Sequence, residues 1–284
     1  MIKKQVLGTA QFGLDYYGIS NFSKKKSANQ LMPLLYKAYI NGVKFFDTAP
    51  DYNSEKILGT FIKKYKLYNK VNIITKIPKL KKNKDFLKQI SVSIKRSYKK
   101  LKVKKLFCIL MHHQGDFEMI KNEQEAITLL KKKFKIKHFG FSVYDLNKAK
   151  RILKKFPNAA LQFPYNLMNN DFKKLKKNKN LFFARSIFCQ GLLTSKKIKT
   201  VNNLLNFLFK KYINYIKLDN INPVNLCLDY AYSNKNIDYI VYGVKDIHEL
   251  NQIMAYKKRK KIDLKKIKKI KTFFKLKNMD PRKW

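Results

Sequence analysis

Four polar side chains stand at or just beyond the ends of apolar segments, and together they could reduce a carbonyl group. Asp47 closes the segment that begins at Val43, and Tyr52 follows in the next loop. Lys76 and His112 close the next two apolar segments. A carbonyl that accepts a hydride develops negative charge on its oxygen and needs a proton donor. The set therefore predicts proton transfer to a carbonyl oxygen.

Each of the four residues has its own predicted role. Tyr52 would donate the proton, and the ammonium of Lys76 would lower the pKa of the phenol from its ordinary value of about 10. Asp47 would hold Lys76 charged, because a buried ammonium without a partner loses its proton. His112 Nε2 would hydrogen-bond the carbonyl oxygen and orient it. The neighbouring His113 is expected to point away from the mouth where these residues meet, since side chains alternate along a strand.

These residues can meet only if the apolar segments lie side by side. Eight short β-rich segments alternate with amphipathic segments of helical period. Eight such units in 284 residues favour an α/β fold, a closed parallel (β/α)8 TIM barrel, with a doubly wound open sheet as the alternative. No Gly-x-Gly-x-x-Gly follows the first strand, which counts against a dinucleotide-binding open sheet. In a (β/α)8 barrel the active site lies at the carboxyl ends of the strands.

The expected elements follow the chain in order. The strands are Lys4–Gly8, Val43–Asp47, Val71–Lys76, Leu106–His112, Lys137–Ser142, Ala160–Pro164, Leu181–Ser186 and Tyr239–Gly243. The helices are Ser27–Asn41, Ser54–Tyr65, Lys84–Leu101, Glu118–Phe134, Leu146–Phe156, Asp171–Lys177, Val201–Ile216 with Pro223–Ser233, and Ile247–Lys257. We expect residues 1–284 to form a single domain, with 257–284 as a basic C-terminal helix and tail packed on the barrel.

The composition is strongly basic, with 64 Lys and Arg against 18 Asp and Glu and a net charge of +46. Such a charge is typical of proteins that bind nucleic acids. The chain has only five arginines, however, and arginine is the residue that contacts phosphates bidentately. Its lysines are spread over nearly every expected helix. This favours a solvated basic surface with no specific nucleic-acid partner, and a nucleic-acid-associated protein stays the alternative.

The cysteines and the apolar segments exclude several other classes of protein. Cys108, Cys189 and Cys227 lie far apart without a Cys-x-x-Cys pair, which argues against a disulfide scaffold or a structural zinc site. No apolar run reaches the ~20 residues that span a bilayer. The N-terminus enters a strand-like segment at once and leaves no room for a signal peptide. These features predict a cytoplasmic protein with no membrane span.

The order of the motifs resembles that of the aldo-keto reductase family. The stretch Phe46–Gly59 resembles the most specific motif of the family, an Asp and a Tyr five residues apart before a Glu and a Gly. It is preceded by Gly8–Gly13 and followed in the family's order by Thr75-Lys76, Met111-His112, Gly140–Ser142, Gln162–Asn166 and Gln190–Leu193. The resemblance runs to about Ile253. It implies a (β/α)8 barrel without a metal, an extended NADPH or NADH, and Asp47, Tyr52, Lys76 and His112 in the roles given above.

The resemblance also implies contacts to the cofactor. Ser142 and Gln162 match positions that hydrogen-bond the nicotinamide carboxamide, although Val143 stands where an Asn usually follows. Arg185 stands where many members stack an aromatic ring on the nicotinamide, and its guanidinium plane could stack instead. The complete set of predicted cofactor residues is Gly8, Thr9, Ser142, Gln162, Arg185, Ser186, Gly191, Gly243, Val244, Lys245 and Glu249.

Two of these residues bear on the choice between NADPH and NADH. Glu249 would repel a 2′-phosphate and Lys245 would attract it. The positive charge of the chain favours NADPH, and NADH stays open. The expected partner is a small carbonyl compound, and resemblance to a branch linked to surface-carbohydrate synthesis suggests a sugar-like one. The sequence leaves the oligomeric state undetermined. A cofactor-binding regulatory or redox-sensing subunit is the alternative function. The presence of all four catalytic residues argues against it.

Overall fold

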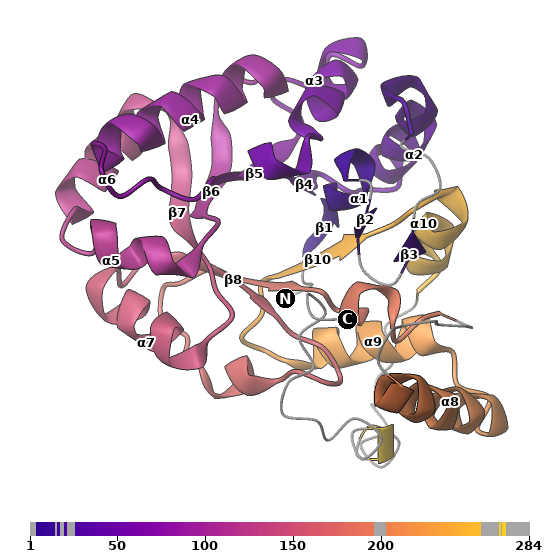
Figure 1. Cartoon of the computed structure of the whole chain (residues 1–284). Helices are drawn as coiled ribbons and strands as arrows, with labels where there is room; N and C mark the ends of the chain where they lie inside the picture. The colour runs from indigo at the N-terminus through magenta and orange to yellow at the C-terminus, as the bar shows by residue number, and fades with distance from the viewer. Residues whose placement is uncertain are drawn as a thin grey trace.

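The computed structural model describes residues 4–14, 16–17, 20–21, 26–195, 203–256, 267 and 269–270. Eight parallel strands close into a barrel in the order β1-β10-β9-β8-β7-β6-β5-β4, which confirms the predicted (β/α)8 fold (Figure 1). The barrel strands are β1 (Lys4–Gly8), β4 (Phe45–Asp47), β5 (Asn72–Ile77), β6 (Leu106–Met111), β7 (Ile136–Ser142), β8 (Ala160–Pro164), β9 (Phe182–Arg185) and β10 (Tyr239–Gly243).

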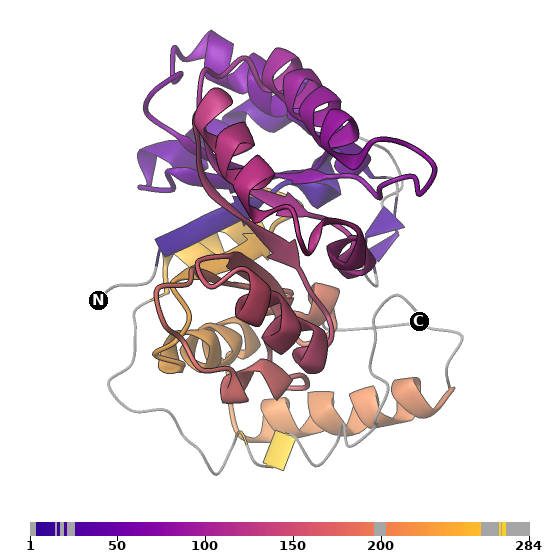
Figure 2. The same cartoon turned by 90° about the vertical axis from the view of Figure 1, so that its left-hand side faces the viewer.

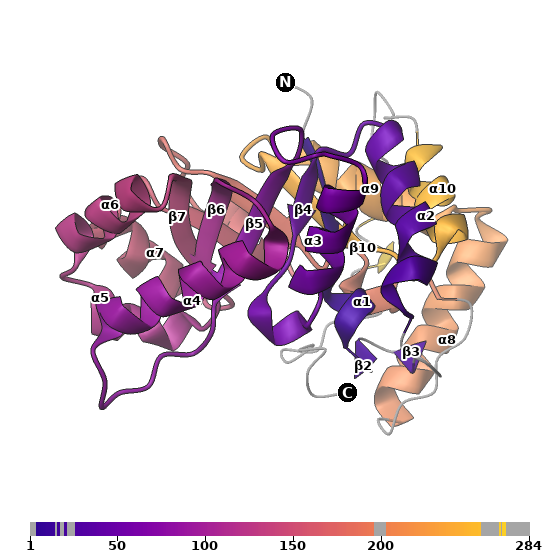
Figure 3. The same ribbon diagram turned by 90° about the horizontal axis from the view of Figure 1, so that it is seen from above.

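Helices surround the barrel and cover its outer face (Figures 1 and 3). The longer ones are α2 (Ala28–Ile40), α3 (Glu55–Lys64), α4 (Phe86–Leu101), α6 (Gln124–Lys133), α7 (Leu146–Lys155), α8 (Asn203–Leu218), α9 (Pro223–Ser233) and α10 (Ile247–Met254). Capping explains where several of them begin. Ser27 and Gln30 form a reciprocal capping box at the start of α2, and Asp85 caps α4. In Figure 2, α8 lies at the edge of the molecule, beyond α9.

Two layers of buried side chains identify the inside and outside of the barrel. Adjacent residues of a strand face opposite sides, and in β1 Val6 belongs to one apolar cluster while Leu7 belongs to another. The cluster of Leu7 includes the buried residues of the helices, so the cluster of Val6 fills the barrel interior. Phe45 of β4 and Ile74 of β5 belong to the interior cluster. Asp47 and Lys76, two residues further on, therefore also face the interior.

Some predicted helices differ from the observed elements. The expected helix Glu118–Phe134 is two, a short α5 (Phe117–Ile120) and α6, because Glu123 adopts a non-helical backbone with φ −100° and ψ 33°. The expected helix Asp171–Lys177 is a single 3-10 turn, η3 (Asp171–Lys174), which ends where Leu175 becomes extended. Isolated segments this short gain few intrahelical hydrogen bonds. The sequence also did not reveal α1 (Ala10–Gly13), nor the small antiparallel pair β2 (Tyr16–Tyr17) and β3 (Ser20–Asn21).

The predicted C-terminal helix is described only in part. Residues 267, 269 and 270 are helical, and Ile267 and Ile270 are buried. The remainder of 257–284 lies outside the described residues. Within the part of the chain that the structure describes, no helix is long and apolar enough to cross a membrane.

Candidate active site

An ion pair is buried inside the barrel where β4 and β5 end. Lys76 Nζ donates to Asp47 Oδ1 at 2.7 Å and to the backbone oxygen of Thr48 at 2.9 Å. The other carboxylate oxygen, Asp47 Oδ2, accepts a 2.7 Å hydrogen bond from Gln162 Nε2 of β8. Only 1% of the Lys76 side chain and 6% of the Asp47 side chain are exposed. Three side chains from three strands thus satisfy one another's hydrogen-bonding groups.

A cluster of buried hydroxyls fixes the loop that follows Asp47. The backbone nitrogen of Thr9 and its Oγ1 both donate to the backbone oxygen of Asp47, at 2.9 and 3.0 Å. Ser54 Oγ lies 2.8 Å from Thr9 Oγ1 and 3.0 Å from Thr48 Oγ1. Gly13 lets α1 approach this loop, since a Cβ on Gly13 would stand 1.9 Å from the backbone oxygen of Tyr52. The conformation of the loop is therefore set by contacts on both sides.

Tyr52 ends the 3-10 turn η1 (Pro50–Tyr52), directly above the ion pair. Lys76 Nζ lies 4.8 Å from the centroid of the tyrosine ring. Burial raises the pKa of the Tyr52 phenol above its ordinary range, the charge of Asp47 adds to the rise, and the charge of Arg185 opposes it. The expected lowering of this pKa by Lys76 is not confirmed, because the cation that lowers it is Arg185. The phenol therefore keeps its proton at neutral pH.

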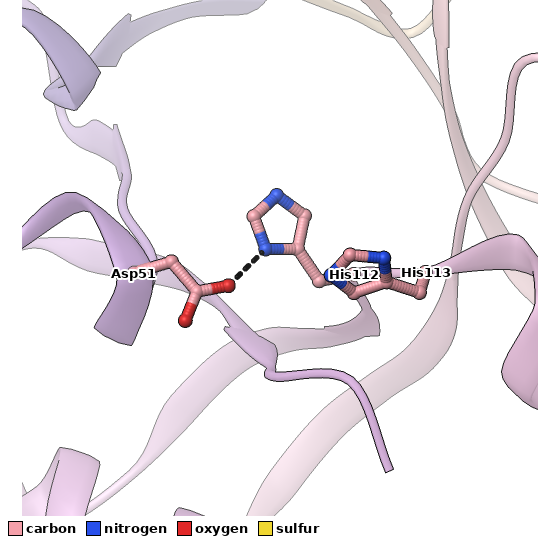
Figure 4. Close-up of side chains that lie close together, drawn as sticks. All are labelled: Asp51, His112 and His113. Carbon is pink, nitrogen blue, oxygen red and sulfur yellow. Dashed lines mark hydrogen bonds and ion pairs between the residues drawn. The ribbon is translucent and has the colours of Figure 1, made fainter.

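His112 follows β6 and is held by an aspartate from the Tyr52 loop. Figure 4 shows its Nδ1 facing Asp51, and the distance to Asp51 Oδ2 is 2.9 Å. An ionised carboxylate only accepts, so the proton of this contact belongs to Nδ1. Burial first, and then the charge of Lys76, lowers the pKa of His112 to about 4, so the ring is neutral at neutral pH. Its Nε2 then carries a lone pair, which is at odds with the predicted donation to a carbonyl oxygen.

His113 does not turn away from its neighbour as strand alternation would require. The two imidazole centroids are 5.4 Å apart, and one polar atom each of Asp51, His112 and His113 lies within 4.8 Å of the others, a spacing at which they could share a cation (Figure 4). The reason is that β6 ends at Met111, one residue before the predicted end. Both histidines lie beyond the strand, where its period of two no longer applies.

A cavity of about 410 Å³ opens beside Tyr52 at the carboxyl ends of the strands. Of the residues predicted to act in catalysis or to contact the cofactor, those that line it are Gly8, Asp47, Tyr52, Gln162, Arg185, Ser186, Gly191, Gly243, Lys245 and Glu249. The structure does not put Thr9, Lys76, His112, Ser142 or Val244 on this wall. Thr9 and Val244 are fully buried, and Ser142 is nearly so.

Several wall residues escaped the sequence analysis. Gln11 lies in the first motif, but nothing in its spacing marked it as part of a site. Its Oε1 is buried, has no hydrogen-bond partner among the described residues, and packs close to Gly243. Gln190 takes a left-handed backbone, φ 54°, which no sequence pattern announced. The other additional wall residues are Ala10, Ile187, Phe188, Thr194, Ser195, Val224, Val241, Tyr242, His248, Gln252 and Ile253.

The loop after β10 combines the two residues expected to oppose each other in cofactor choice. Lys245 Nζ lies 3.3 Å from Glu249 Oε1, and the Lys245 backbone nitrogen donates to Glu249 Oε2 at 2.8 Å. Lys26 Nζ also donates to the Lys245 backbone oxygen at 2.6 Å. Lys245 and Glu249 thus offset one another instead of acting independently.

Comparison with known proteins is consistent with this geometry. The model of the aldo/keto reductase family matches residues 5–274, nearly the whole chain. The chain belongs to this family. Membership of the aldo/keto reductases implies oxidoreductase activity. No curated protein sequence matches the chain.

Solved aldo/keto reductase structures share the fold at low sequence identity. Aldo-keto reductase AKR11C1 from Bacillus halodurans, in its holo form, has a TM-score of 0.77 and 16% identity, covering 95% of this chain and 91% of its own. Glycerol dehydrogenase AKR11B4 from Gluconobacter oxydans has a TM-score of 0.70 and 18% identity, covering 94% and 90%. A putative aldo-keto reductase from Pseudomonas aeruginosa has a TM-score of 0.63 and 19% identity, covering 88% of both chains.

Proposed function

We propose that this aldo/keto reductase uses NADPH or NADH to reduce an aldehyde or ketone to the alcohol, with Tyr52 as the proton donor. The observation that carries the proposal is the protonated Tyr52 on the cavity wall, directly above the buried Asp47 and Lys76 pair. A family fold alone does not fix a reaction, whereas a proton donor on a cavity wall gives a specific chemical capability.

The wall of the cavity suits a nicotinamide dinucleotide. Gly8 and Gly243 end neighbouring strands on the wall. Gln11 Oε1 is an acceptor without a donor, which a carboxamide N–H would satisfy. Ser186 and Lys245 offer a hydroxyl and an ammonium for phosphates. The bound cofactor would supply the hydride, and these residues would hold it beside Tyr52.

The remaining chemistry belongs to the chain. Tyr52 would transfer its proton to the carbonyl oxygen as negative charge develops there. Lys76, held by Asp47, would stabilise the phenolate that is left, since its ammonium lies over the ring. The lone pair of His112 Nε2 would accept a hydrogen bond from the alcohol product. In the reverse direction the same contact would orient an alcohol for oxidation.

Two finer assignments complete the proposal. We assign the enzyme to the cytoplasm, because its three cysteines are free and buried, as is usual in a reducing compartment. We also propose a small carbonyl substrate of sugar-like character, which the polar wall of Gln162, Ser186 and Gln190 supports through its hydrogen-bonding groups.

Titration of the purified chain with NADPH and NADH, followed by nicotinamide fluorescence, tests the proposal directly. We expect at least one cofactor to bind and then to be oxidised when short aldehydes are added. Failure of both cofactors to change the fluorescence would contradict the proposal. Binding without oxidation of any aldehyde would favour a regulatory subunit instead.

We favour NADPH over NADH because of the positive surface, and the pair Lys245 and Glu249 gives this preference its own test. Changing Glu249→Arg removes the carboxylate that neutralises Lys245. The variant should tighten NADPH more than NADH, by ~1 kcal/mol in this partly exposed place. Equal effects on the two cofactors would show that this loop does not contact the 2′ position.

A further inference from the structure

Arg185 is the cation on the cavity wall that lacks a carboxylate. Among the charged wall residues, Asp47 pairs with Lys76, and Lys245 pairs with Glu249. Within the described residues, no carboxylate oxygen lies within 4.0 Å of the Arg185 guanidinium. Among the described residues, the guanidinium donates a hydrogen bond to a neutral hydroxyl, from Nη1 to Ser186 Oγ at 3.4 Å.

The guanidinium is also short of hydrogen-bond acceptors. Arg185 Nη2 is buried and, within the described part of the chain, has no hydrogen-bond partner, although it carries two N–H donors. A buried donor without an acceptor costs about 1–3 kcal/mol, and a donor on a charged group costs more. An unsatisfied buried group in a folded protein calls for a specific explanation, such as a catalytic role or a bound water or ion.

The position of Arg185 relative to Tyr52 indicates which ligand it would meet. Arg185 ends β9, and its charge opposes the rise that burial causes in the pKa of the Tyr52 phenol. One face of the guanidinium is covered by Tyr144, whose ring centroid is 4.1 Å away, so its orientation is restrained. The carbonyl that takes the Tyr52 proton must therefore lie near this cation.

We infer that Arg185 binds an anionic group of the substrate, so that the enzyme acts on carbonyl compounds which carry a carboxylate or a phosphate close to the carbonyl. Guanidinium suits both groups, because its planar fork matches two oxygens at once. The inference rests on the proposed function for the reacting carbonyl. It adds the chemical class of the substrate, and it gives Arg185 a role beyond stacking on a cofactor ring.

Matched substrates test the inference with the full chain. Succinate semialdehyde against butanal compares a carboxylate with a methyl group, and glyceraldehyde 3-phosphate against glyceraldehyde compares a phosphate with a hydroxyl. We expect kcat/KM of the wild-type enzyme to favour at least one anionic member, and Arg185→Gln to reduce that preference by about 10- to 100-fold. The readout is the ratio of the kcat/KM values of the two members, because Arg185 also lines the cavity and its charge acts on Tyr52, so its removal affects both members. The two pairs distinguish a carboxylate from a phosphate.

Two further variants make the result specific. Arg185→Lys keeps the charge without the planar fork, and it should retain part of the preference if Arg185→Gln is too unstable to measure. Lys104→Gln removes one positive charge from an exposed residue just before β6, at the opposite end of the barrel, and should leave the preference unchanged. A wild-type enzyme without anionic preference would overturn the inference. The inference would also be overturned if Arg185→Gln reduced kcat/KM equally for both substrates of a pair.

Calorimetric binding of the alcohol products separates this inference from the proposed function. The probes are 4-hydroxybutyrate against butan-1-ol and glycerol 3-phosphate against glycerol, with no cofactor present. Binding of an anionic probe that Arg185→Gln abolishes would support the anion site even if no aldehyde were reduced. Absence of anion binding alongside normal reduction of neutral aldehydes would overturn the site and leave the proposed function intact.

Discussion

At the scale of single residues, the buried pair of Asp47 and Lys76 is an expensive arrangement for stability alone. Each charge loses its hydration, and their mutual attraction offsets this only because all the carboxylate oxygens and the ammonium have partners. A pair of apolar residues of similar volume would fold as well or better. The pair is therefore best explained by the ring of Tyr52 above it, which a fixed ammonium can influence during proton transfer.

Breaking this pair should uncouple stability from activity. Lys76→Met leaves Asp47 charged and buried beside Gln162, and we expect it to lower the free energy of unfolding by ~3–5 kcal/mol. The double variant Asp47→Asn with Lys76→Met removes both charges and should recover most of that loss. Turnover should be lost in the single variant and should not return in the double variant. Urea unfolding of the single and double variants measures the difference, and equal stability of the single variant and wild type would contradict the account.

Tyr52→Phe removes the proton donor while keeping the ring. We expect the kcat for aldehyde reduction to fall by ~10²–10⁴, with cofactor binding nearly unchanged, because the hydroxyl acts only in the transition state. Tyr165→Phe is a matched control, since Tyr165 is buried, stacks on Tyr230 and does not line the cavity. Stopped-flow and steady-state rates measure the effect. Near wild-type turnover of Tyr52→Phe would remove this residue from the acid role.

At the scale of elements, the prediction succeeded where periodicity and position decide the structure. Apolar runs located every barrel strand to within two residues at either end, and the period of two puts Asp47 and Lys76 on the same interior surface. It failed where a contact far away in the sequence decides. The end of β6 at Met111, and with it the direction of His113, is not encoded in the apolar run itself.

The same distinction holds for the site. Spacing in the sequence brought forward Tyr52 and His112, but the bond from Asp51 to His112 joins elements that are 61 residues apart. Only the barrel shows that this bond fixes the imidazole proton on Nδ1. The unsatisfied acceptor of Gln11, its Oε1, likewise depends on the packing of α1 against β10, which no local sequence pattern describes.

The packing of α1 against the Tyr52 turn gives a test at this scale. Gly13→Ala would bring a Cβ to 1.9 Å from the Tyr52 backbone oxygen, so the turn has to move. A displacement near 1 Å can cost ~10²-fold in rate, and we expect kcat to fall by that order. Gly42→Ala is the control, since Gly42 has a φ of +93° with open space around it.

The control substitution should destabilise by about 1 kcal/mol through backbone strain, without changing kcat per folded molecule. Thermal unfolding and steady-state kinetics on both variants provide the comparison. Equal kcat for Gly13→Ala and wild type would mean that the turn can shift without disturbing Tyr52.

At the scale of the whole molecule, the basic charge is distributed around the barrel. Lysines occupy the last turns of α3, α4, α6 and α7, where a positive charge interacts favourably with the helix dipole. A nucleic-acid surface would instead gather its cations on one face. The distribution therefore supports the interpretation of a solvated basic surface, with self-repulsion as its cost.

Self-repulsion predicts that salt stabilises the protein. A net charge of +46 on a compact barrel raises the free energy of the folded state relative to the expanded chain. The Debye length falls from ~30 Å at 0.01 M to ~8 Å at 0.15 M, so added salt screens most of this repulsion. We expect Tm to rise by at least ~2–4 °C, the shift produced by about 1 kcal/mol in a chain of roughly this size. Sodium chloride and choline chloride should act alike if screening is the cause. A Tm that stays constant or falls with both salts would show that the lysines are too well solvated to repel one another.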